Sequence, residues 1–178
     1  MRLMLTLLFL ATAAGADPMM IEDFDAASND RWRYTSDRVM GGVSSGEAGL
    51  GREGNLTFAR LRGTVSTANN GGFIQIRTTL PESLQDSTSA IRLRVRGNGA
   101  TYYVHLRPGT ARRPWQYYQA SFDTTSTWQE ILLPLTAFEP RGGLSAQFRP
   151  SDIRGIGLVA FGADYEAALD IDWIATAD

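Results

Sequence analysis

The sequence predicts an all-β fold, a two-sheet sandwich of the jelly-roll type, and three observations lead there. Apolar and polar side chains alternate with a period of two, most clearly in residues 89–97, where Ile91, Leu93 and Val95 share one face. Short segments of this kind recur along the chain, separated by turns rich in glycine and asparagine. No stretch keeps the periodicity of a long helix. Many short strands in one chain are typical of sandwiches and barrels.

The predicted elements follow one another in a regular order. The predicted strands cover residues 20–24, 31–35, 56–62, 72–78, 89–97, 101–107, 116–122, 129–133, 155–161 and 169–174. Gly97-Asn98-Gly99 predicts a hairpin that pairs the two strands beside it, and residues 69–72 predict another Asn/Gly turn. Short helical turns are expected near residues 135–138 and 150–153. The longest irregular segments are predicted at residues 37–55 and 109–115.

The first residues resemble a secretion signal. Arg2 precedes an apolar run that ends at Ala14-Gly15-Ala16, small residues of the kind found before a cleavage site. The run is roughly a dozen residues, whereas a membrane-spanning helix needs about 20, so a retained anchor is the weaker alternative. We therefore expect a periplasmic or secreted protein in which residues 1–16 are removed and residues 17–178 form one domain. Its only membrane contact would be through the cleaved signal.

Composition excludes several classes of function. The 17 basic residues, all arginine, against 19 acidic residues give a net charge of −2, which argues against a nucleic-acid-binding protein. The absence of cysteine excludes disulfides, thiol chemistry and cysteine-ligated metals. His105 is the single histidine, so a cluster of histidines around a metal is impossible. We predict no catalytic activity and no cofactor.

Carboxylates near the two chain ends leave one metal alternative open. If the terminal strands pair, a structural Ca²⁺ could be held by oxygen ligands, although ordinary surface charge is the simpler interpretation. The residues concerned are Glu22, Asp23, Asp25, Asp170 and Asp172.

Residues 36–46, Ser-Asp-Arg-Val-Met-Gly-Gly-Val-Ser-Ser-Gly, invite two interpretations. In the first they only shape the chain: Gly41 and Gly42 permit positive φ and close backbone approach, and Asp37 accepts hydrogen bonds from loop amides. Met40 would then fill an irregular gap in the core. In the second, polar loop residues bind a protein partner. The partner-binding candidates are Asp37, Arg38, Met40, Ser44, Asn69, Asn70 and Arg77. We expect the glycines and Asp37 to shape the loop and Arg38 to contact the partner.

A second group of candidates depends on the predicted hairpin at residues 97–99. If its strands pair, the polar faces of both strands form one strip of arginine and aromatic side chains. This strip is either a solvated face whose arginines pair with carboxylates, or a ligand-binding face on which a sugar ring stacks. The ligand-face candidates are Arg92, Arg94, Arg96, Tyr103, His105, Arg107 and Trp115.

The order of several motifs resembles a known family. Residues 36–46 are followed by Gly-Thr-Val-Ser-Thr-Ala-Asn-Asn-Gly-Gly-Phe-Ile-Gln-Ile-Arg at residues 63–77, and weaker matches continue to Leu-Asp-Ile-Asp-Trp-Ile at residues 169–174. This is similar to the complex I intermediate-associated protein family. The resemblance implies a galactose-binding-like jelly roll without enzymatic activity, and its mitochondrial members are chaperones for the assembly of complex I.

The predicted function is therefore an exported, protein-binding or assembly-type module whose partner the sequence does not name. A carbohydrate-binding module that uses the arginine and aromatic face is the alternative, in which case the ligand is a glycan.

Overall fold

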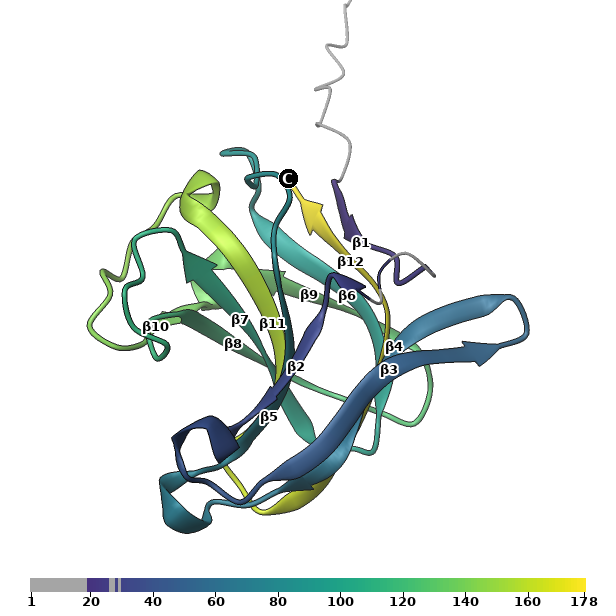
Figure 1. Cartoon of the computed structure of the whole chain (residues 1–178). Helices are drawn as coiled ribbons and strands as arrows, with labels where there is room; N and C mark the ends of the chain where they lie inside the picture. Colours follow the sequence, from purple (N-terminus) through teal and green to yellow (C-terminus); the bar gives the residue numbers. More distant parts are fainter. Residues whose placement is uncertain (1–18, 26–27, 29) are drawn as a thin grey trace, which may run out of the picture.

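The computed structural model describes residues 19–25, 28 and 30–178, and two antiparallel sheets form the layers of a sandwich (Figure 1). The predicted signal peptide, residues 1–16, lies outside the described residues. The first sheet has the order β3-β4-β12-β6-β9, with β1 paired to β12, and the second has the order β10-β8-β7-β11-β5-β2. The predicted all-β jelly-roll sandwich is confirmed.

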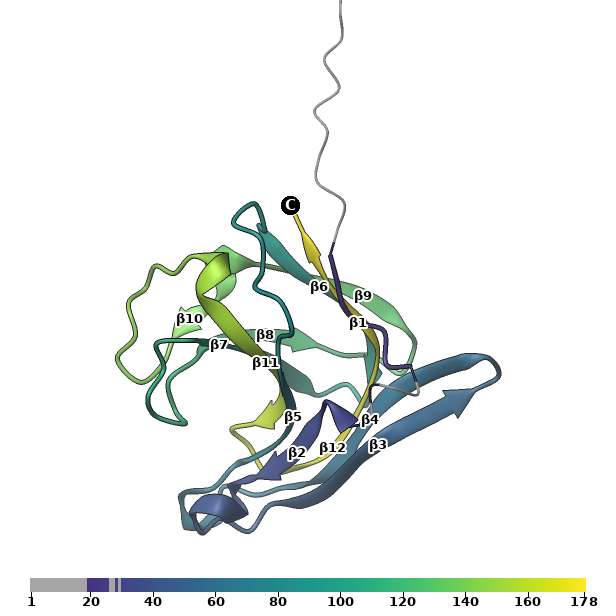
Figure 2. The ribbon, with the colours of Figure 1, turned by 45° about the horizontal axis from the view of Figure 1, so that its top comes forward.

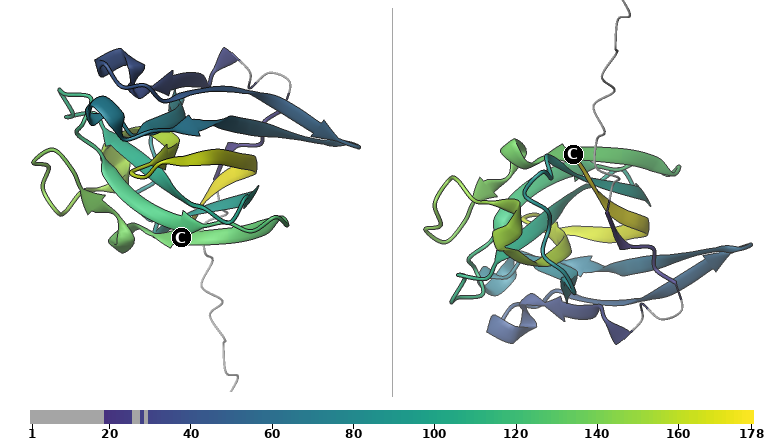
Figure 3. Two further views of the ribbon diagram at one scale, coloured as in Figure 1. Left: turned by 90° about the horizontal axis from the view of Figure 1, so that it is seen from below. Right: turned by 90° about the horizontal axis from the view of Figure 1, so that it is seen from above.

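The strands have the following bounds. The first sheet contains β1 (Met20–Glu22), β3 (Ser45–Glu53), β4 (Leu56–Val65), β6 (Ala90–Gly97), β9 (Gln129–Pro134) and β12 (Tyr165–Ala177). The second contains β2 (Arg33–Ser36), β5 (Phe73–Thr79), β7 (Thr101–Pro108), β8 (Tyr118–Asp123), β10 (Glu139–Pro140) and β11 (Ile153–Phe161). The two layers are seen from both ends in Figure 3.

Alternation along each strand builds the core between the sheets. Ile91, Leu93 and Val95 of β6 are buried, as are Ile74 and Ile76 of β5, and the residues between them face outward. Because successive side chains of a strand point to opposite faces, each sheet has one core face and one outer face. The outer faces are where binding residues can lie.

Short 3₁₀ turns connect some strands. They are η2 (Asp37–Met40), η3 (Ala68–Asn70), η4 (Leu135–Ala137) and η5 (Pro150–Asp152). The last two lie where the sequence predicts helical turns. Over the part of the chain that the structure describes, no helix is both long and apolar enough to cross a bilayer.

One strand lies inside a segment predicted to be irregular. β3 runs through residues 45–53 and pairs with β4 along its whole length, and the β3–β4 hairpin projects beyond the other strands (Figure 2). Gly46, Gly49 and Gly51 interrupt its side-chain pattern, so alternation could not reveal it. Packing requires glycine at position 51, because an added Cβ would lie 2.4 Å from the Phe58 ring.

The prediction that residues 97–99 form a hairpin between paired strands is wrong. β6 pairs with β12 and β9 in the first sheet, whereas β7 pairs with β11 and β8 in the second, so the turn carries the chain across the sandwich. The Asn98 side chain fixes this crossing, donating to the Glu166 carbonyl (2.6 Å) and accepting from the buried Tyr102 hydroxyl (2.8 Å). Glycine and asparagine suit both a hairpin within one sheet and a crossing between the two sheets, so only the strand pairing distinguishes these connections.

Candidate binding site

A buried carboxylate organises the loop that opens at residue 37. Asp37 is fully buried and accepts hydrogen bonds from the Ser44 amide (3.0 Å) and hydroxyl (2.5 Å), and from the amides of Gly72 (2.5 Å) and Phe73 (3.2 Å). Burial acts to raise the pKa of Asp37, but the hydrogen bonds from Gly72, Ser44 and Phe73 outweigh it and lower the pKa. Asp37 therefore joins the η2 loop to the β4–β5 connection as an ion.

The glycines around Asp37 serve two different needs. Gly41 ends η2 at a φ of 92°, a left-handed conformation that side chains rarely adopt, and a Cβ there would meet nothing within 4 Å. Gly42 leaves no room, since its Cβ would lie 2.3 Å from Asp37 Cγ. Gly71 is restricted by the same carboxylate, since a Cβ there would lie 2.4 Å from Asp37 Oδ2. Gly42 and Gly71 are thus fitted around the Asp37 side chain, whereas Gly41 is needed for its left-handed conformation.

Ser44 has the same structural role from the opposite side. Residues 42–46, Gly-Val-Ser-Ser-Gly, match the Gly-x-Ser-x-Gly spacing of hydrolase nucleophiles. However, Ser44 is buried, leads into an edge strand instead of a helix, and donates its hydroxyl proton to Asp37 and accepts from the Ser66 amide (3.0 Å). Its hydroxyl holds the loop and is not presented to a substrate.

The predicted partner-binding residues divide by exposure. Asp37 and Ser44 are buried, so neither can contact a partner, and the expectation that Met40 fills a core gap is also wrong, since 63% of its surface is exposed. Arg38 is exposed, as are Asn69 and Asn70. Arg77 is exposed at the far end of β5, four residues beyond Phe73 and hence about 13 Å along the strand. Arg77 therefore belongs to a different surface.

Two exposed apolar residues were missed by the sequence interpretation. Val39 (75% exposed) and Val43 (44%) flank Met40 in the chain, and we call these three residues the apolar knuckle. Val and Met look like core residues in a sequence, and only the coordinates reveal that a short loop turns them to solvent.

The outer face of the first sheet carries the arginines of β6, and each has an acidic partner. Arg96 joins Arg60 and Arg62 around the buried Asp170, with N···O distances of 3.0, 3.0 and 2.7 Å. Arg94 pairs with Asp172. Burial acts to raise the pKa of Asp170, but its arginine partners lower it overall. This sheet matches the interpretation in which arginines pair with carboxylates.

Aromatic rings fill the remaining space on this face. Phe58 and Trp128 meet edge to face with centroids 5.5 Å apart, and the Arg96 guanidinium lies over Trp128 at 4.6 Å. Guanidinium groups that cover rings and bind carboxylates at the same time have few donors left for a ligand. Arg92, Arg94 and Arg96, which the sequence suggests as ligand-binding residues, are therefore held by ion pairs and ring contacts within the protein.

The outer face of the second sheet is different. One row of register neighbours crosses all six strands, and we call it the central row: Arg33 (β2), Arg77 (β5), Gly157 (β11), His105 (β7), Gln119 (β8) and Glu139 (β10). Within the described residues, neither Arg33 nor Arg77 forms an ion pair or hydrogen bond, and His105 Nε2 and Gln119 Oε1 are buried without a partner. Arg33 and Arg77 therefore have donors that the protein itself does not use, whereas the buried His105 and Gln119 atoms lie side by side in the row and are out of reach of a ligand.

Aromatic side chains adjoin the central row. The Tyr117 ring stacks on His105 with centroids 3.9 Å apart, and Tyr103 meets Phe161 edge to face at 5.8 Å. Burial lowers the pKa of His105 to about 3, with Arg141 adding to this shift and Gln119 opposing it. His105 is consequently neutral at physiological pH and presents a flat, uncharged ring system with Tyr117.

The last predicted ligand-face residues lie at one end of this sheet. Arg107 donates to the carbonyls of Pro114 (3.2 Å) and Ala111 (3.4 Å), and so fixes the loop before β8. Trp115 on that loop is 53% exposed, with the Arg113 guanidinium over its ring at 5.5 Å. Tyr103, His105, Arg107 and Trp115 thus lie with the second sheet, and the predicted single strip with the β6 arginines does not exist.

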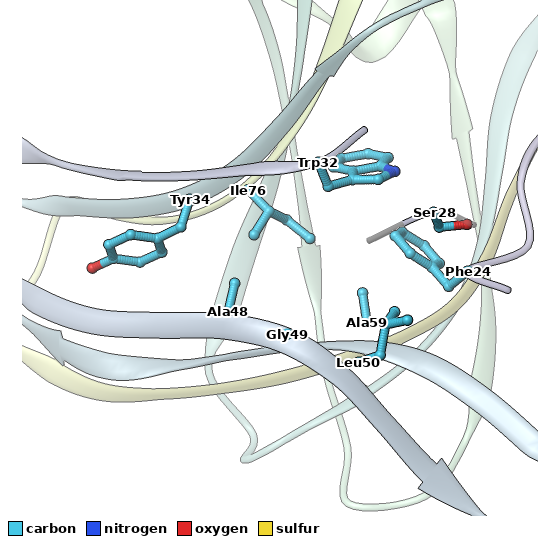
Figure 4. Close-up of a pocket in the computed structure, with 9 residues that line it drawn as sticks. All are labelled: Phe24, Ser28, Trp32, Tyr34, Ala48, Gly49, Leu50, Ala59 and Ile76. Atoms are coloured by element: carbon cyan, nitrogen blue, oxygen red, sulfur yellow. The ribbon is translucent and has the colours of Figure 1, made fainter. Parts of the chain in front are cut away.

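A crevice opens between the edge strands β2 and β3 (Figure 4). Trp32 and Phe24 meet in it with centroids 5.2 Å apart, and the buried Tyr34 hydroxyl has no hydrogen-bond partner. Small residues of the first sheet, Ala48 and Gly49 among them, leave the space open. None of the residues predicted from the sequence lines it.

The terminal carboxylates are engaged by donors from side chains. β1 pairs with β12, which is the condition for the calcium alternative. However, Glu22 accepts from Ser28 (2.6 Å), Arg31 (2.8 Å) and the Trp32 indole (2.7 Å), while Asp170 accepts from arginines. Across residues 19–25, 28 and 30–178, no group of three or more acidic or histidine side chains is arranged to hold a metal ion.

Comparison with known proteins shows which family the chain belongs to. The family model described as complex I intermediate-associated protein 30 matches residues 22–171. The chain belongs to this family. A mouse relative, complex I intermediate-associated protein 30, mitochondrial, is 28% identical over 145 residues, which cover 71% of this chain and 42% of the relative. The chain thus spans about two fifths of that relative's length, and the resemblance noted in the sequence is confirmed.

Solved structures of carbohydrate-binding modules share the fold. A family 11 module from Clostridium thermocellum, in complex with a β-1,3-1,4-mixed-linked tetrasaccharide, has a TM-score of 0.73 at 15% identity and covers 93% of this chain and 97% of its own. A family 30 module has a TM-score of 0.52 at 17% identity and covers 76% and 93%. At these identities the likeness establishes a common sandwich fold and leaves the ligand of this chain open.

Proposed function

We propose that this family member is a non-catalytic binding module that recognises another protein through the apolar knuckle. The observation that carries the proposal is the exposure of Val39, Met40 and Val43 on a loop whose conformation is fixed from beneath by Asp37. A loop whose backbone is already fixed loses little backbone entropy when a partner buries its side chains. Membership of a family named for association with assembly intermediates supports a protein ligand.

The absence of catalysis is part of the same proposal. The only histidine has a pKa of about 3 and lies beneath Tyr117, so it is a poor general base at neutral pH. Ser44, which has the spacing of a hydrolase nucleophile, is buried against Asp37.

The knuckle is tested by charge substitution with a matched control. Val39→Asp with Met40→Asp in one variant should abolish capture of the partner. Leu132→Asp should leave capture unchanged, because Leu132 is similarly exposed (58%) but lies on β9, at the edge of the first sheet opposite β3. Arg38→Ala should weaken capture, since its side chain is exposed beside the knuckle. A partner identified by cross-linking with wild-type protein would be purified and titrated against all variants. Equal affinity for the wild type and the doubly charged variant would refute the proposal.

Carbohydrate binding is the second candidate function, and the second sheet favours it. Its outer face combines aromatic rings, Tyr117 stacked on His105 and Tyr103 edge to face with Phe161, with the exposed arginines of β2 and β5, which have no partner in the described chain. Shallow aromatic surfaces with a few polar groups suit sugar rings, which are apolar on their faces and polar at their rims. The sandwich shared with carbohydrate-binding modules supports this candidate at the level of fold.

A glycan array tests the second candidate. Tyr103→Ala should weaken binding of any glycan that the wild type retains, whereas Trp173→Ala, a partly exposed aromatic residue on the first sheet, should not. An array on which folded wild-type protein binds nothing would remove this candidate and leave the knuckle proposal unaffected.

A further inference from the structure

Two arginines face each other on the second sheet without any counter-charge. Arg33 and Arg77 are register partners on β2 and β5, both are exposed, and neither has an ion pair or hydrogen bond among the described residues. Like charges placed directly opposite on neighbouring strands destabilise a sheet. The protein keeps this unfavourable pair at its surface, where an anion would relieve it.

The first sheet provides an internal comparison. There Arg60, Arg62 and Arg96 share one buried aspartate, and Arg92 pairs with Glu130 at 2.8 Å. On the second sheet Glu139 of β10 pairs with Arg141 at 3.0 Å, but within the described residues no acidic side chain pairs with Arg33 or Arg77. Arg52 of the first sheet is also unpaired, but it lies opposite Thr57. What distinguishes the second sheet is that two unpaired arginines lie directly opposite each other.

Neutral hydrogen-bonding groups lie beside this pair. Gly157 separates Arg77 from His105 in the central row, and a Cβ on Gly157 would lie 3.4 Å from Gln75 Oε1, so the Gln75 amide leans over the glycine. No side-chain hydrogen bond engages that amide within the described residues. A free glutamine amide can both donate to and accept from hydroxyl groups. Gln119, in contrast, lies on β8, two strands beyond Gly157, and is only 7% exposed, so it is not available to a ligand.

The aromatic rings lie within reach of the same groups. Arg77 and His105 are two strands apart, which is about 10 Å at the usual strand spacing, and Tyr103 is the register partner of Val159 in the next row. A ligand that contacts both the arginine pair and the rings must be longer than one sugar unit.

We infer that the outer face of the second sheet binds an acidic oligosaccharide, whose carboxylate is held by Arg33 and Arg77, whose hydroxyls are bound by Gln75, and whose ring lies against Tyr103. The inference rests on the second candidate function proposed above and specifies its ligand class. Guanidinium groups bind carboxylates through paired, charge-assisted hydrogen bonds, and removing one such bond weakens binding about tenfold.

An acidic peptide is the competing ligand, and the geometry favours sugar. Extended peptides are bound mainly through backbone hydrogen bonds to an unpaired sheet edge. Only the outer strands β2 and β10 of the central row are sheet edges, and the strands between them, β5, β11, β7 and β8, have a backbone that is already paired on both sides. The groups left to contact a ligand on this face are flat aromatic rings and side-chain amides, and these groups suit the faces and hydroxyls of a sugar.

The test compares matched ligands by isothermal titration calorimetry. The probes are oligogalacturonate, oligomannuronate and hyaluronan oligomers, each with its carboxyl-reduced counterpart, and an oligoglutamate peptide of similar charge. Wild-type protein should bind at least one acidic oligomer about tenfold more tightly than its reduced form. Arg33→Gln and Arg77→Gln should each remove most of that preference. Arg92→Gln, whose arginine is paired on the first sheet, should retain it. Tyr103→Ala should weaken the acidic and reduced forms equally.

Each other outcome contradicts a defined part of the inference. Equal binding of acidic and reduced oligomers would overturn the acidic preference while leaving carbohydrate binding in place. Binding of oligoglutamate as tight as that of the best oligosaccharide would overturn the sugar and indicate simple charge attraction. Failure to bind any oligosaccharide would overturn both the inference and the carbohydrate-binding function on which it rests. Circular dichroism and thermal melting would establish that every variant is folded.

Discussion

Individual residues decide how this sandwich presents its loops, and Asp37 is the clearest case. Its carboxylate accepts four hydrogen bonds from two separate connections, and two glycines, Gly42 and Gly71, lie too close to it for any side chain. A buried ion with this many donors is stabilised in one geometry only. The loop above it is therefore as well defined as a strand.

Gly42→Ala should destabilise the protein more than Gly41→Ala. The new Cβ at residue 42 would lie 2.3 Å from Asp37 Cγ and displace the carboxylate from its donors, costing about 2–3 kcal/mol. At residue 41 the space is open and only the left-handed conformation is penalised, which costs about 1 kcal/mol. Urea denaturation of both variants measures the difference. A larger loss for Gly41→Ala would show that conformation, not space around Asp37, limits this loop.

His105 should make stability depend on pH. Its pKa is about 3 in the folded protein and about 6.5 when unfolded, so below pH 6.5 the unfolded state binds the proton and folding weakens as pH falls. The loss approaches about 1.4 kcal/mol per pH unit between the two pKa values. His105→Gln should show a smaller loss between about pH 6.5 and pH 5, above the range where most carboxylates titrate. Parallel urea curves for both proteins at these pH values are the measurement, and equal pH dependence would contradict the assignment.

At the scale of strands, Asp170 joins three elements of the first sheet. It lies on β12 and accepts from Arg60 and Arg62 of β4 and from Arg96 of β6. Asp170→Asn should cost about 2–3 kcal/mol, less than a fully buried ion pair because the arginines are partly exposed. Glu130→Gln, which breaks the exposed pair with Arg92, should change stability by about 0.5 kcal/mol or less. Equal melting temperatures for these two variants would show that the cluster contributes no more than a surface pair.

Strand patterns in the sequence predict the class of fold and miss parts of its pairing. Regular alternation in β5, β6 and β7 identifies these strands and their buried faces, because a two-sided sheet needs it. The glycines of β3 erase the same signal, and the turn after Gly97 suits a hairpin and a crossing equally. Because β6 and β7 belong to different sheets, the predicted ligand-binding residues are divided between two surfaces. The central row is invisible in the sequence because its six members come from six strands.

For the whole molecule, the proposed export has a direct measurement. The apolar run after Arg2 and the small residues at positions 14–16 predict that the mature chain begins at Asp17. Protein produced in a bacterium with its own N-terminus should be recovered from the periplasm with an intact mass that corresponds to residues 17–178. Recovery of a periplasmic product that still contains residues 1–16 would rule out this cleavage.

The projecting β3–β4 hairpin has a consequence for solubility. β3 is an edge strand, paired only with β4, so one side of its backbone is free to pair with another molecule. Gly46, Gly49 and Gly51 make it a poor template for such pairing, since glycine is disfavoured in strands. A Cβ at residue 49 meets nothing within 4 Å, so Gly49→Val should raise the melting temperature, yet it should also promote self-association visible in light scattering. If so, the glycines that conceal this strand from sequence analysis are also what keeps the protein from polymerising through its longest free edge.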